Sequence, residues 1–317
     1  MQIFVSGSLA YDRIMDFPGR FVDHILPEKI HILNVCFMVN GLTERFGGTA
    51  GNIAYNLALL GEKPVILATA GKDFGPYREW LTKLGLPLDG IKEIPQEFTA
   101  GAYITTDRAD NQITGFNPGA MKHRSQYKFD GVDPTAAQAI VAPGGLEDML
   151  AYTRAYKARG VPYLFDPGQS IPAWPGDDLQ EMANGAQALI VNDYELEMFR
   201  QKTGLAEKEL LKLTPMLITT RGETGSYLST AAGREDVPAV FASQVLDPTG
   251  AGDAYRAGLL KGLALGLSWS ESARMGAVLA SFCVELQGTQ EHRVEIYQFW
   301  ERYRQNFGTP PAGAEVK

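Results

Sequence analysis

The chain has 317 residues, of which 45% are hydrophobic and 21% are charged, and its formal net charge is -8 at pH 7. This composition is typical of a globular protein with one large core or two lobes. The acidic balance argues against a broad binding surface for nucleic acid or anionic lipid. Any phosphate group must therefore be bound locally, and we expect no nucleic-acid partner.

The two cysteines, Cys36 and Cys283, lie far apart and show no CxxC spacing. We therefore expect neither a disulfide framework nor a thiolate zinc site. The N-terminal stretch MQIFVSGSLAYD has no basic leader, and no segment reaches the roughly 18 apolar residues that a membrane span needs. These features favour a cytoplasmic protein without a targeting signal or a membrane partner.

Short apolar runs and helical patterns alternate along the chain. Strands are expected at 2–7, 64–71, 137–143, 161–168 and 186–192. Helices are expected at 51–61, 76–85, 146–160, 193–204, 251–266, 268–288 and 293–307. The β-α-β order predicts an α/β fold, a doubly wound and mainly parallel sheet flanked by helices. Ligands of such folds bind at the carboxyl ends of the strands.

Two regions, 13–46 and 98–120, break this alternation. Both are rich in β-branched and aromatic residues and in turn dipeptides, with no helical period. We interpret them as one small β-sheet lid assembled from two insertions, and a pair of long surface loops is the alternative. Segments 1–12, 47–97 and 121–317 would form a large α/β nucleotide-binding domain. Exposed sheet edges on such a lid favour a homodimer in which two lids cover each other.

The stretch DPTGAGDAYRAG, residues 247–258, opens a predicted helix. The backbone amides of Gly250, Ala251 and Gly252 would lie at its N-terminus, where amides and the helix dipole attract an anion. A carboxylate there would repel a phosphate unless it had a separate task. For Asp253 the natural task is to orient and deprotonate an attacking hydroxyl. The pattern indicates phosphoryl transfer, and a helix-stabilising acid in the first turn is the alternative.

Asn192 and Glu195 directly follow the apolar strand ALIV. Their spacing places an amide and a carboxylate on one helical face at the carboxyl end of a strand. Such oxygen ligands suit Mg²⁺ held mostly through water. The alternative is a helix-capping Asn with its capping-box Glu.

Two long stretches resemble the signatures of the ribokinase-like (PfkB) carbohydrate kinases: FGGTAGNIAYNLALLG at 46–61 and DPTGAGDAYRAG at 247–258. Between them, NDYE and TTRGETG stand in their expected places. Further stretches, among them GSLAYDRIMDFPGRF, FNPGAM, DPGQ and GTQ, are similar to bacterial adenosine kinases of that superfamily. The resemblance implies an ATP-dependent kinase that phosphorylates the ribose 5′-hydroxyl of adenosine in purine salvage. A broad-specificity nucleoside kinase, a sugar kinase and a non-catalytic nucleoside sensor stay as alternatives.

The resemblance also assigns roles to single residues. Asp253 would be the base, and the Gly250, Ala251 and Gly252 amides would stabilise the phosphoryl group. The substrate would contact Ser8, Asp12, Gly48, Asn52, Phe116 and Gln169. ATP would contact Asn192, Thr220, Gly222, Gly225 and Ser281. Glu195 would hold Mg²⁺ through water, and Asp247 and Thr249 occupy positions where the family often binds a monovalent cation such as K⁺.

One position departs from the pattern of the adenosine kinases. Relatives of that type usually stack the purine between lid aromatics, and here one of those positions is Ala102 while Phe116 is kept. Because stacking of a base on an aromatic ring is worth about 1 to 3 kcal/mol, its loss would weaken adenosine binding or widen base tolerance. The neighbouring Tyr103 would point to the opposite face of a strand.

Overall fold

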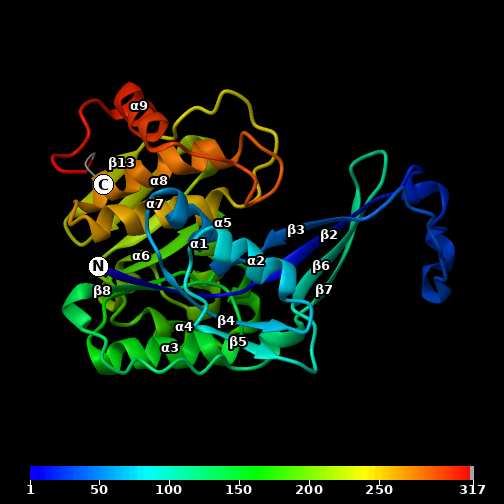
Figure 1. The fold of residues 1–317 in the computed structure, drawn as a ribbon, viewed down its shortest axis with the longest axis horizontal. Helices are drawn as coiled ribbons and strands as arrows, with labels where there is room; N and C mark the ends of the chain where they lie inside the picture. The colour runs from blue at the N-terminus through cyan, green and yellow to red at the C-terminus, as the bar shows by residue number, and fades with distance from the viewer. Residues whose placement is uncertain (315–317) are drawn as a thin grey trace.

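The computed structural model describes residues 1–314, so residues 315–317 of the predicted large domain lie outside the described residues. Over the described range, one sheet has nine strands in the order β13-β12-β11-β10-β9-β8-β1-β4-β5 (Figure 1). Their bounds are β1 (Gln2–Ser6), β4 (Val65–Gly71), β5 (Ile91–Ile94), β8 (Ala137–Val141), β9 (Tyr163–Phe165), β10 (Ala188–Asn192), β11 (Leu217–Thr220), β12 (Ser226–Thr230) and β13 (Gly233–Val237). At one edge, β12 pairs antiparallel with both β11 and β13, and the other pairs are parallel.

Helices cover both faces of this sheet. One face carries α1 (Thr49–Leu59), α2 (Gly75–Lys83), α7 (Ala251–Ala264), α8 (Trp269–Cys283) and α9 (Ile296–Phe307). The other carries α3 (Leu146–Arg159), α4 (Gly176–Ala183), α5 (Asp193–Thr203) and α6 (Glu207–Leu213). The central strands are buried on both sides, which explains their continuous apolar runs. No helix within residues 1–314 is both long and apolar enough to cross a membrane.

The predicted mainly parallel α/β fold is therefore confirmed, with one helix shorter than expected. The helix predicted over 268–288 ends at Cys283. Beyond it, the Val284 carbonyl accepts from the Leu246 amide at 2.8 Å, and the Gly288 amide donates to Asp247 Oδ2 at 3.0 Å. These bonds tie the segment after α8 to the loop before α7, so the helix cannot continue.

A second sheet has, within the described residues, four strands in the order β3-β2-β6-β7. They are β2 (Ala10–Asp16), β3 (Thr43–Gly47), β6 (Ala100–Thr106) and β7 (Gln112–Asn117). The predicted small sheet is confirmed, but only the two ends of the first insertion contribute strands to it, because residues 17–42 contain no strand. Its first strand begins at Ala10, inside the segment assigned to the large domain. The division of the chain into two domains stays a prediction.

The register of the second sheet places four side chains side by side across it. Asp12 on β2 pairs with Arg45 on β3 and with Ala102 on β6, and Ala102 pairs with Phe116 on β7. Residues paired in this way lie on the same face of a sheet. Ala102 and Phe116 are thus direct neighbours, and Tyr103 lies on the opposite face.

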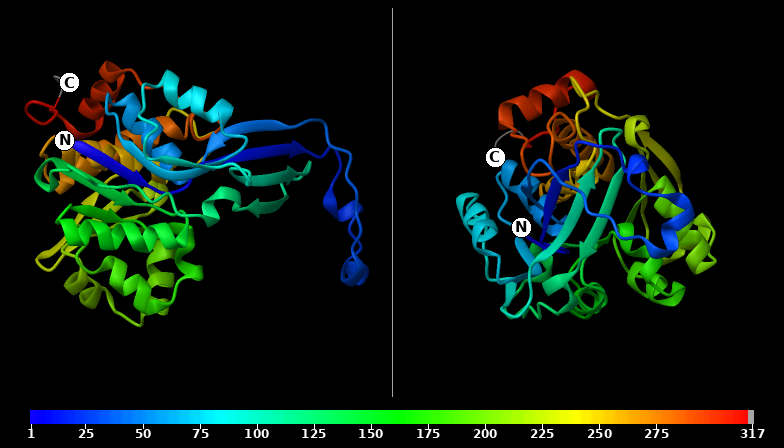
Figure 2. Two further views of the ribbon diagram at one scale, coloured as in Figure 1. Left: turned by 60° about the horizontal axis from the view of Figure 1, so that its bottom comes forward. Right: turned by 90° about the vertical axis from the view of Figure 1, so that its right-hand side faces the viewer.

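An arm of residues 17–42 joins β2 to β3 and reaches beyond the small sheet, away from the large one (Figure 2). Phe17, Phe21 and Phe37 pack together at its base, with ring centroids 4.7 to 5.6 Å apart. Most of its other apolar side chains are exposed, whereas Ile25, Val35 and Val39 are partly buried. The exposed ones are Val22, Leu26, Ile30, Ile32, Leu33, Met38 and Leu42. An apolar surface of this kind marks an interaction site.

Candidate active site

A cavity of about 260 Å³ opens at the carboxyl edge of the large sheet. Pro143, Asp166, Asn192 and Thr220 stand at or just after the ends of β8, β9, β10 and β11, and all of them line it. The start of α7 closes the cavity with Gly250, Gly252, Asp253 and Arg256, and the remaining lining residues are Thr49, Gly168, Gln169 and Glu195. Parallel strands bring their carboxyl ends to one edge, which is why residues far apart in the sequence meet here.

The turn before α7 is shaped by its glycines. Gly250 has a φ of 81°, a left-handed conformation that favours glycine, and a Cβ there would lie 3.0 Å from Thr289 Cγ2. No side chain caps α7, so the amides of its first turn are open to an anion. The Ala251 amide donates to the Pro248 carbonyl at 3.2 Å. An anion would therefore be held by the amides that follow Ala251.

Asp253 lies half-buried in the first turn of α7, at the wall of the cavity. Its Oδ2 accepts a hydrogen bond from Asn52 Nδ2 at 2.8 Å. Burial raises the pKa of Asp253 to about 6, although the positive charge of Arg256 and the Asn52 bond act in the opposite direction. A carboxylate with a pKa just below neutrality is ionised at physiological pH and still able to accept a proton.

Asn52 is itself held in one orientation. Its Oδ1 accepts from Gln290 Nε2 at 3.0 Å, and Gln290 Oε1 accepts from Trp80 Nε1 at 2.9 Å. Because an indole nitrogen only donates, Trp80 fixes which end of the Gln290 amide faces Asn52, and Gln290 then directs the Asn52 amide nitrogen to Asp253. The family resemblance assigned Asn52 to the substrate, and its contact with Asp253 was not predicted.

A buried ion pair lies beside Asp253. Arg256 Nη2 donates to Asp166 Oδ1 at 2.9 Å, and Arg256 Nε is paired with Asp166 Oδ2. Burial opposes the charge of Arg256, but the nearby negative charge of Asp166 outweighs it and raises the pKa of the guanidinium. Sequence reasoning gave neither residue a role. The spacing of Arg256, three residues after Asp253 on one helix, was the available signal.

Asn192 and Glu195 form a capping box at the start of α5. Asn192 Oδ1 accepts from the Glu195 amide at 2.7 Å, and Glu195 Oε2 accepts from the Asn192 amide at 2.8 Å. Both residues also line the cavity. The two interpretations of this motif are therefore compatible, since a carboxylate used for capping keeps a second oxygen. Burial raises the pKa of Glu195, and the negative charge of Asp166 adds to the effect.

On the side of the small sheet, Asp12 lies over Gly47, where a Cβ would stand 2.8 Å from Asp12 Oδ2. Burial raises the pKa of Asp12, and the charge of Asp247 adds to this while Arg45 opposes it. Gly48 has a φ of 88°, and a Cβ there would lie 2.6 Å from the Ser8 carbonyl oxygen. Gly48 thus allows the backbone at the start of α1 to lie close to the Ser8 carbonyl.

Other predicted residues are engaged elsewhere. Ser8 Oγ accepts from the Thr49 amide at 3.0 Å, at the start of α1. Ser281 is buried in α8, where its hydroxyl donates to the Val278 carbonyl at 2.7 Å and accepts from Arg302. Gly222 and Gly225 belong to the turn after β11. Their neighbour Thr220 lines the cavity, whereas these two glycines are not among the described residues that line it. The roles of these residues in binding stay predictions.

Asp247 and Thr249 form a closed turn before α7. Asp247 Oδ1 accepts from the Thr249 amide at 2.9 Å, and Oδ2 accepts from the Gly288 amide at 3.0 Å. Burial works against the charge, but these hydrogen bonds hold the pKa of Asp247 below its usual range. An ionised carboxylate at this turn is compatible with a cation and does not by itself identify one.

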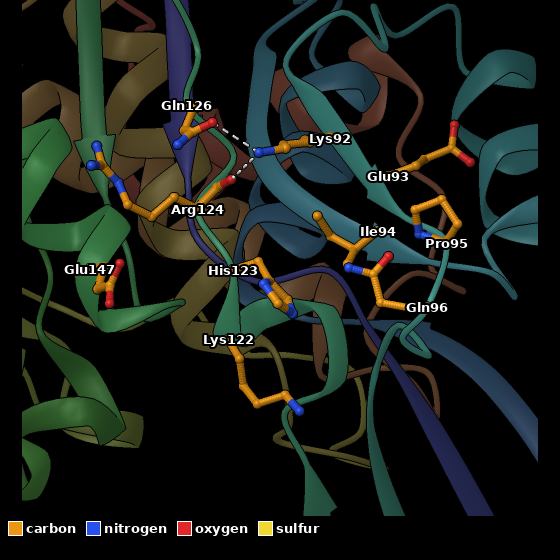
Figure 3. Close-up of a pocket in the computed structure, with 10 residues that line it drawn as sticks. All are labelled: Lys92, Glu93, Ile94, Pro95, Gln96, Lys122, His123, Arg124, Gln126 and Glu147. Carbon is orange, nitrogen blue, oxygen red and sulfur yellow. Dashed lines mark hydrogen bonds between the residues drawn. The ribbon is translucent and has the colours of Figure 1, made fainter.

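A larger hollow of about 560 Å³ lies between β5 and the segment that joins β7 to β8 (Figure 3). Its cations are already paired: Lys92 Nζ donates to the Arg124 carbonyl at 3.1 Å and to Gln126 Oε1 at 3.0 Å, and Lys122 pairs with Glu97 at 3.0 Å. Among the described residues, none that the sequence singled out lines this hollow. Convergent polar groups, and not size, identify the Asp253 cavity as the site.

Comparisons with known proteins agree with this geometry. Residues 19–296 match the model of the pfkB family carbohydrate kinases. The structure of Burkholderia thailandensis nucleoside kinase in complex with inosine is 39% identical, with a TM-score of 0.86, over 98% of this chain and 100% of that chain. The nucleoside kinase of Methanocaldococcus jannaschii is 32% identical over 266 residues, which are 83% of this chain and 87% of that protein.

The match to the family model covers both signature stretches, 46–61 and 247–258, in full. The cavity brings the glycine turn at the start of α7 next to the carboxylate of Asp253. The chain is a phosphotransferase with an alcohol acceptor, and it belongs to the pfkB family of carbohydrate kinases.

Proposed function

We propose that this chain is a nucleoside kinase that transfers the γ-phosphoryl group of ATP to the 5′-hydroxyl of a ribonucleoside. The observation that carries the proposal is the meeting of Asp253, the glycine turn and Glu195 in one cavity. The likeness of this chain to a kinase solved with inosine, and also with ADP-inosine, supports a nucleoside as the acceptor.

In the proposed reaction, Asp253 takes the proton of the 5′-hydroxyl as its oxygen attacks the γ-phosphorus. A new O–P bond forms, the bond from the γ-phosphorus to the bridging oxygen breaks, and ADP leaves. The amides at the start of α7 would stabilise the charge on the moving group. Asn52 keeps its amide nitrogen on Asp253, so the second carboxylate oxygen is left for the hydroxyl.

Glu195 fits a role toward Mg²⁺. Its Oε2 caps α5, and its other oxygen remains for the cavity. Within residues 1–314, no group of three or more His, Cys, Asp or Glu side chains could hold a metal ion. Such a site suits Mg²⁺ held chiefly by nucleotide phosphates and water. When bound, Mg²⁺ would neutralise charge on the β- and γ-phosphates.

The small sheet bears on the choice of base. Ala102 and Phe116 are direct neighbours on the face that also carries Asp12. A base bound here would stack on the ring of Phe116 with one of its faces, and the small side chain of Ala102 would restrict its other face little. This arrangement, together with inosine in the similar kinase, favours a broad-specificity nucleoside kinase over an enzyme limited to adenosine. On the same face, Asp12 can accept hydrogen bonds from ribose hydroxyls.

We also propose that the arm of residues 17–42 and the small sheet form the interface of a homodimer. The arm exposes Leu26, Ile32 and Met38, which are 52%, 67% and 85% accessible. An apolar arm is stabilised when a second copy covers it. Light scattering at micromolar concentration should give twice the mass of one chain, and a strict monomer would contradict the interface.

The function is tested by ADP release with MgATP against adenosine, inosine, guanosine, cytidine, ribose and fructose 6-phosphate. We expect turnover of several nucleosides, with inosine and adenosine within about tenfold of each other, because stacking on an aromatic ring depends little on which base is stacked. Turnover of the free sugars alone would identify a sugar kinase. Binding of nucleosides without ADP release would identify a sensor.

A further inference from the structure

We propose that Arg256, oriented by Asp166, is a catalytic residue that contacts the γ-phosphoryl group during its transfer. This role rests on the proposed kinase function and adds to it a protein cation that the sequence did not assign.

The guanidinium has a defined orientation. Nε and Nη2 face the two carboxylate oxygens of Asp166. The remaining nitrogen, Nη1, lies against the glycine turn, since a Cβ built on Gly252 would be 2.8 Å from it. The ion pair therefore directs one N–H group of Arg256 toward the amides that would hold the phosphoryl group. Gly252 must lack a side chain for the guanidinium to reach this position.

The charges around the cavity require such a group. Asp166, Glu195 and Asp253 supply carboxylates, whereas Arg256 is the one cationic side chain among the described residues that line it. A nucleotide triphosphate would bring further negative charge into the same space. Guanidinium groups suit this task because they stay ionised and donate several hydrogen bonds in a fixed plane.

A structural role alone explains the pair poorly. Buried ion pairs contribute little net stability, and apolar residues of similar volume often replace them without loss. The same helix carries a comparison in Lys261, a buried cation that pairs with Glu62. Lys261 is not among the described residues that line the cavity. It serves as a matched control for the loss of a buried charge from α7.

The arrangement also predicts opposite effects of the two partners on Asp253. The charged groups that act on the pKa of Asp253 are Arg256 on α7, Asp166 after β9 and Glu195 on α5. Two carboxylates of other elements share a neighbour with Asp253. Asp12 and Asp253 both raise the pKa of Tyr77, and Asp247 and Asp253 both raise the pKa of Cys283. Loss of the Arg256 charge should raise the pKa of Asp253, because the Asp253 carboxylate loses a positive neighbour that favours its ionised form. The acid limb of the pH profile of turnover should therefore move to higher pH.

Loss of the Asp166 charge should move the same limb to lower pH, since it removes a like charge and leaves Arg256 in place. A pair whose charges do not act on Asp253 would lower stability in both variants and would not shift the limb in opposite directions. The sign of the two shifts thus tests whether both charges act on Asp253, and the loss of kcat in Arg256→Gln tests the contact with the phosphoryl group.

The experiment compares Arg256→Gln, Arg256→Lys and Asp166→Asn with the wild-type chain and with the control Lys261→Gln. ADP release with MgATP and inosine is measured from about pH 5 to pH 9, together with thermal unfolding. We expect Arg256→Gln to lower kcat by about 10²- to 10³-fold, as for the loss of one donor to a transition-state anion. Arg256→Lys, which keeps the charge, should lose less, and Lys261→Gln should keep kcat.

The results separate two failures. A wild-type chain that phosphorylates no nucleoside would overturn the proposed function and this role with it. An active wild-type chain with Arg256→Gln at normal kcat, or with both partner variants shifting the limb in the same direction, would overturn the role of Arg256 alone. If Arg256→Gln does not fold, Arg256→Lys and Asp166→Asn still report the loss of kcat and the sign of the shift.

Discussion

In a variant with alanine in place of Asn52, the loss of activity on acidification should begin at a higher pH than in the wild type. Asn52 Nδ2 donates to Asp253 Oδ2 at 2.8 Å and thereby stabilises the ionised base. A hydrogen bond to a charged group is worth about 1.5 to 3 kcal/mol, and one pH unit corresponds to about 1.36 kcal/mol. Because Asp253 is half-buried and water can replace part of the bond, we take the lower value. The shift should be about one pH unit.

The direction follows from the active form of the base. Only the ionised carboxylate accepts a proton, so turnover is present above the pKa of Asp253, about 6, and is lost as the pH falls through it. In Asn52→Ala the acid limb of kcat/KM should therefore move to about pH 7. The assay is ADP release with inosine at saturating MgATP over a series of buffers.

Asn56→Ala is the matched control. It removes the same kind of side chain from the same helix, and Asn56 bonds to the Asn52 carbonyl and to His292, not to Asp253. This variant should lose stability but keep the acid limb of the wild type. An Asn52→Ala limb that stays in place, or moves to lower pH, would refute the assigned contact between Asn52 and the base.

Ala102→Phe would place a second ring directly beside Phe116, and kcat/KM for adenosine should rise by about tenfold; a fall would show that the base lies elsewhere. Gly51→Ala would place a Cβ 1.9 Å from Tyr77 Oη, so urea titration should show a free energy of unfolding lower by about 1 to 3 kcal/mol. Unchanged stability would mean that α1 can shift. Chelation of divalent cations by EDTA should abolish ADP release and leave the thermal unfolding temperature unchanged, because the ion would bind with the nucleotide. Turnover that resists EDTA would contradict the proposed use of Mg²⁺.

The sequence predicted much of the fold because its strands are buried on both faces. Such strands appear as short continuous apolar runs, and the polar residues that end them must meet at one edge of a parallel sheet. Asn192 was found in this way, whereas Asp253 was found from the glycine turn before its helix and Thr220 from the family resemblance. All three line one cavity. The small sheet was also recognisable, since its segments lack a helical period.

The partners inside the site could not be predicted in the same way. Asp166 and Arg256 are separated by 90 positions and meet only after the sheet forms. Gln290 reaches Asn52 across 238 positions, from a loop with no strand or helix pattern. Likewise, no pattern in α8 showed that Ser281 would bond to Val278 and Arg302 inside the protein. Pairings of this kind depend on packing, which local sequence does not encode.

The central claim is that Asp253 is the base of a nucleoside kinase, and Asp253→Asn tests it most directly. Asparagine keeps the shape of the side chain and can still contact Asn52, but it cannot accept the proton of the 5′-hydroxyl. ADP binding and thermal unfolding should stay close to those of the wild type, while kcat with inosine falls by about 10²- to 10⁴-fold. A variant that turns over inosine at a near-normal rate would contradict the account.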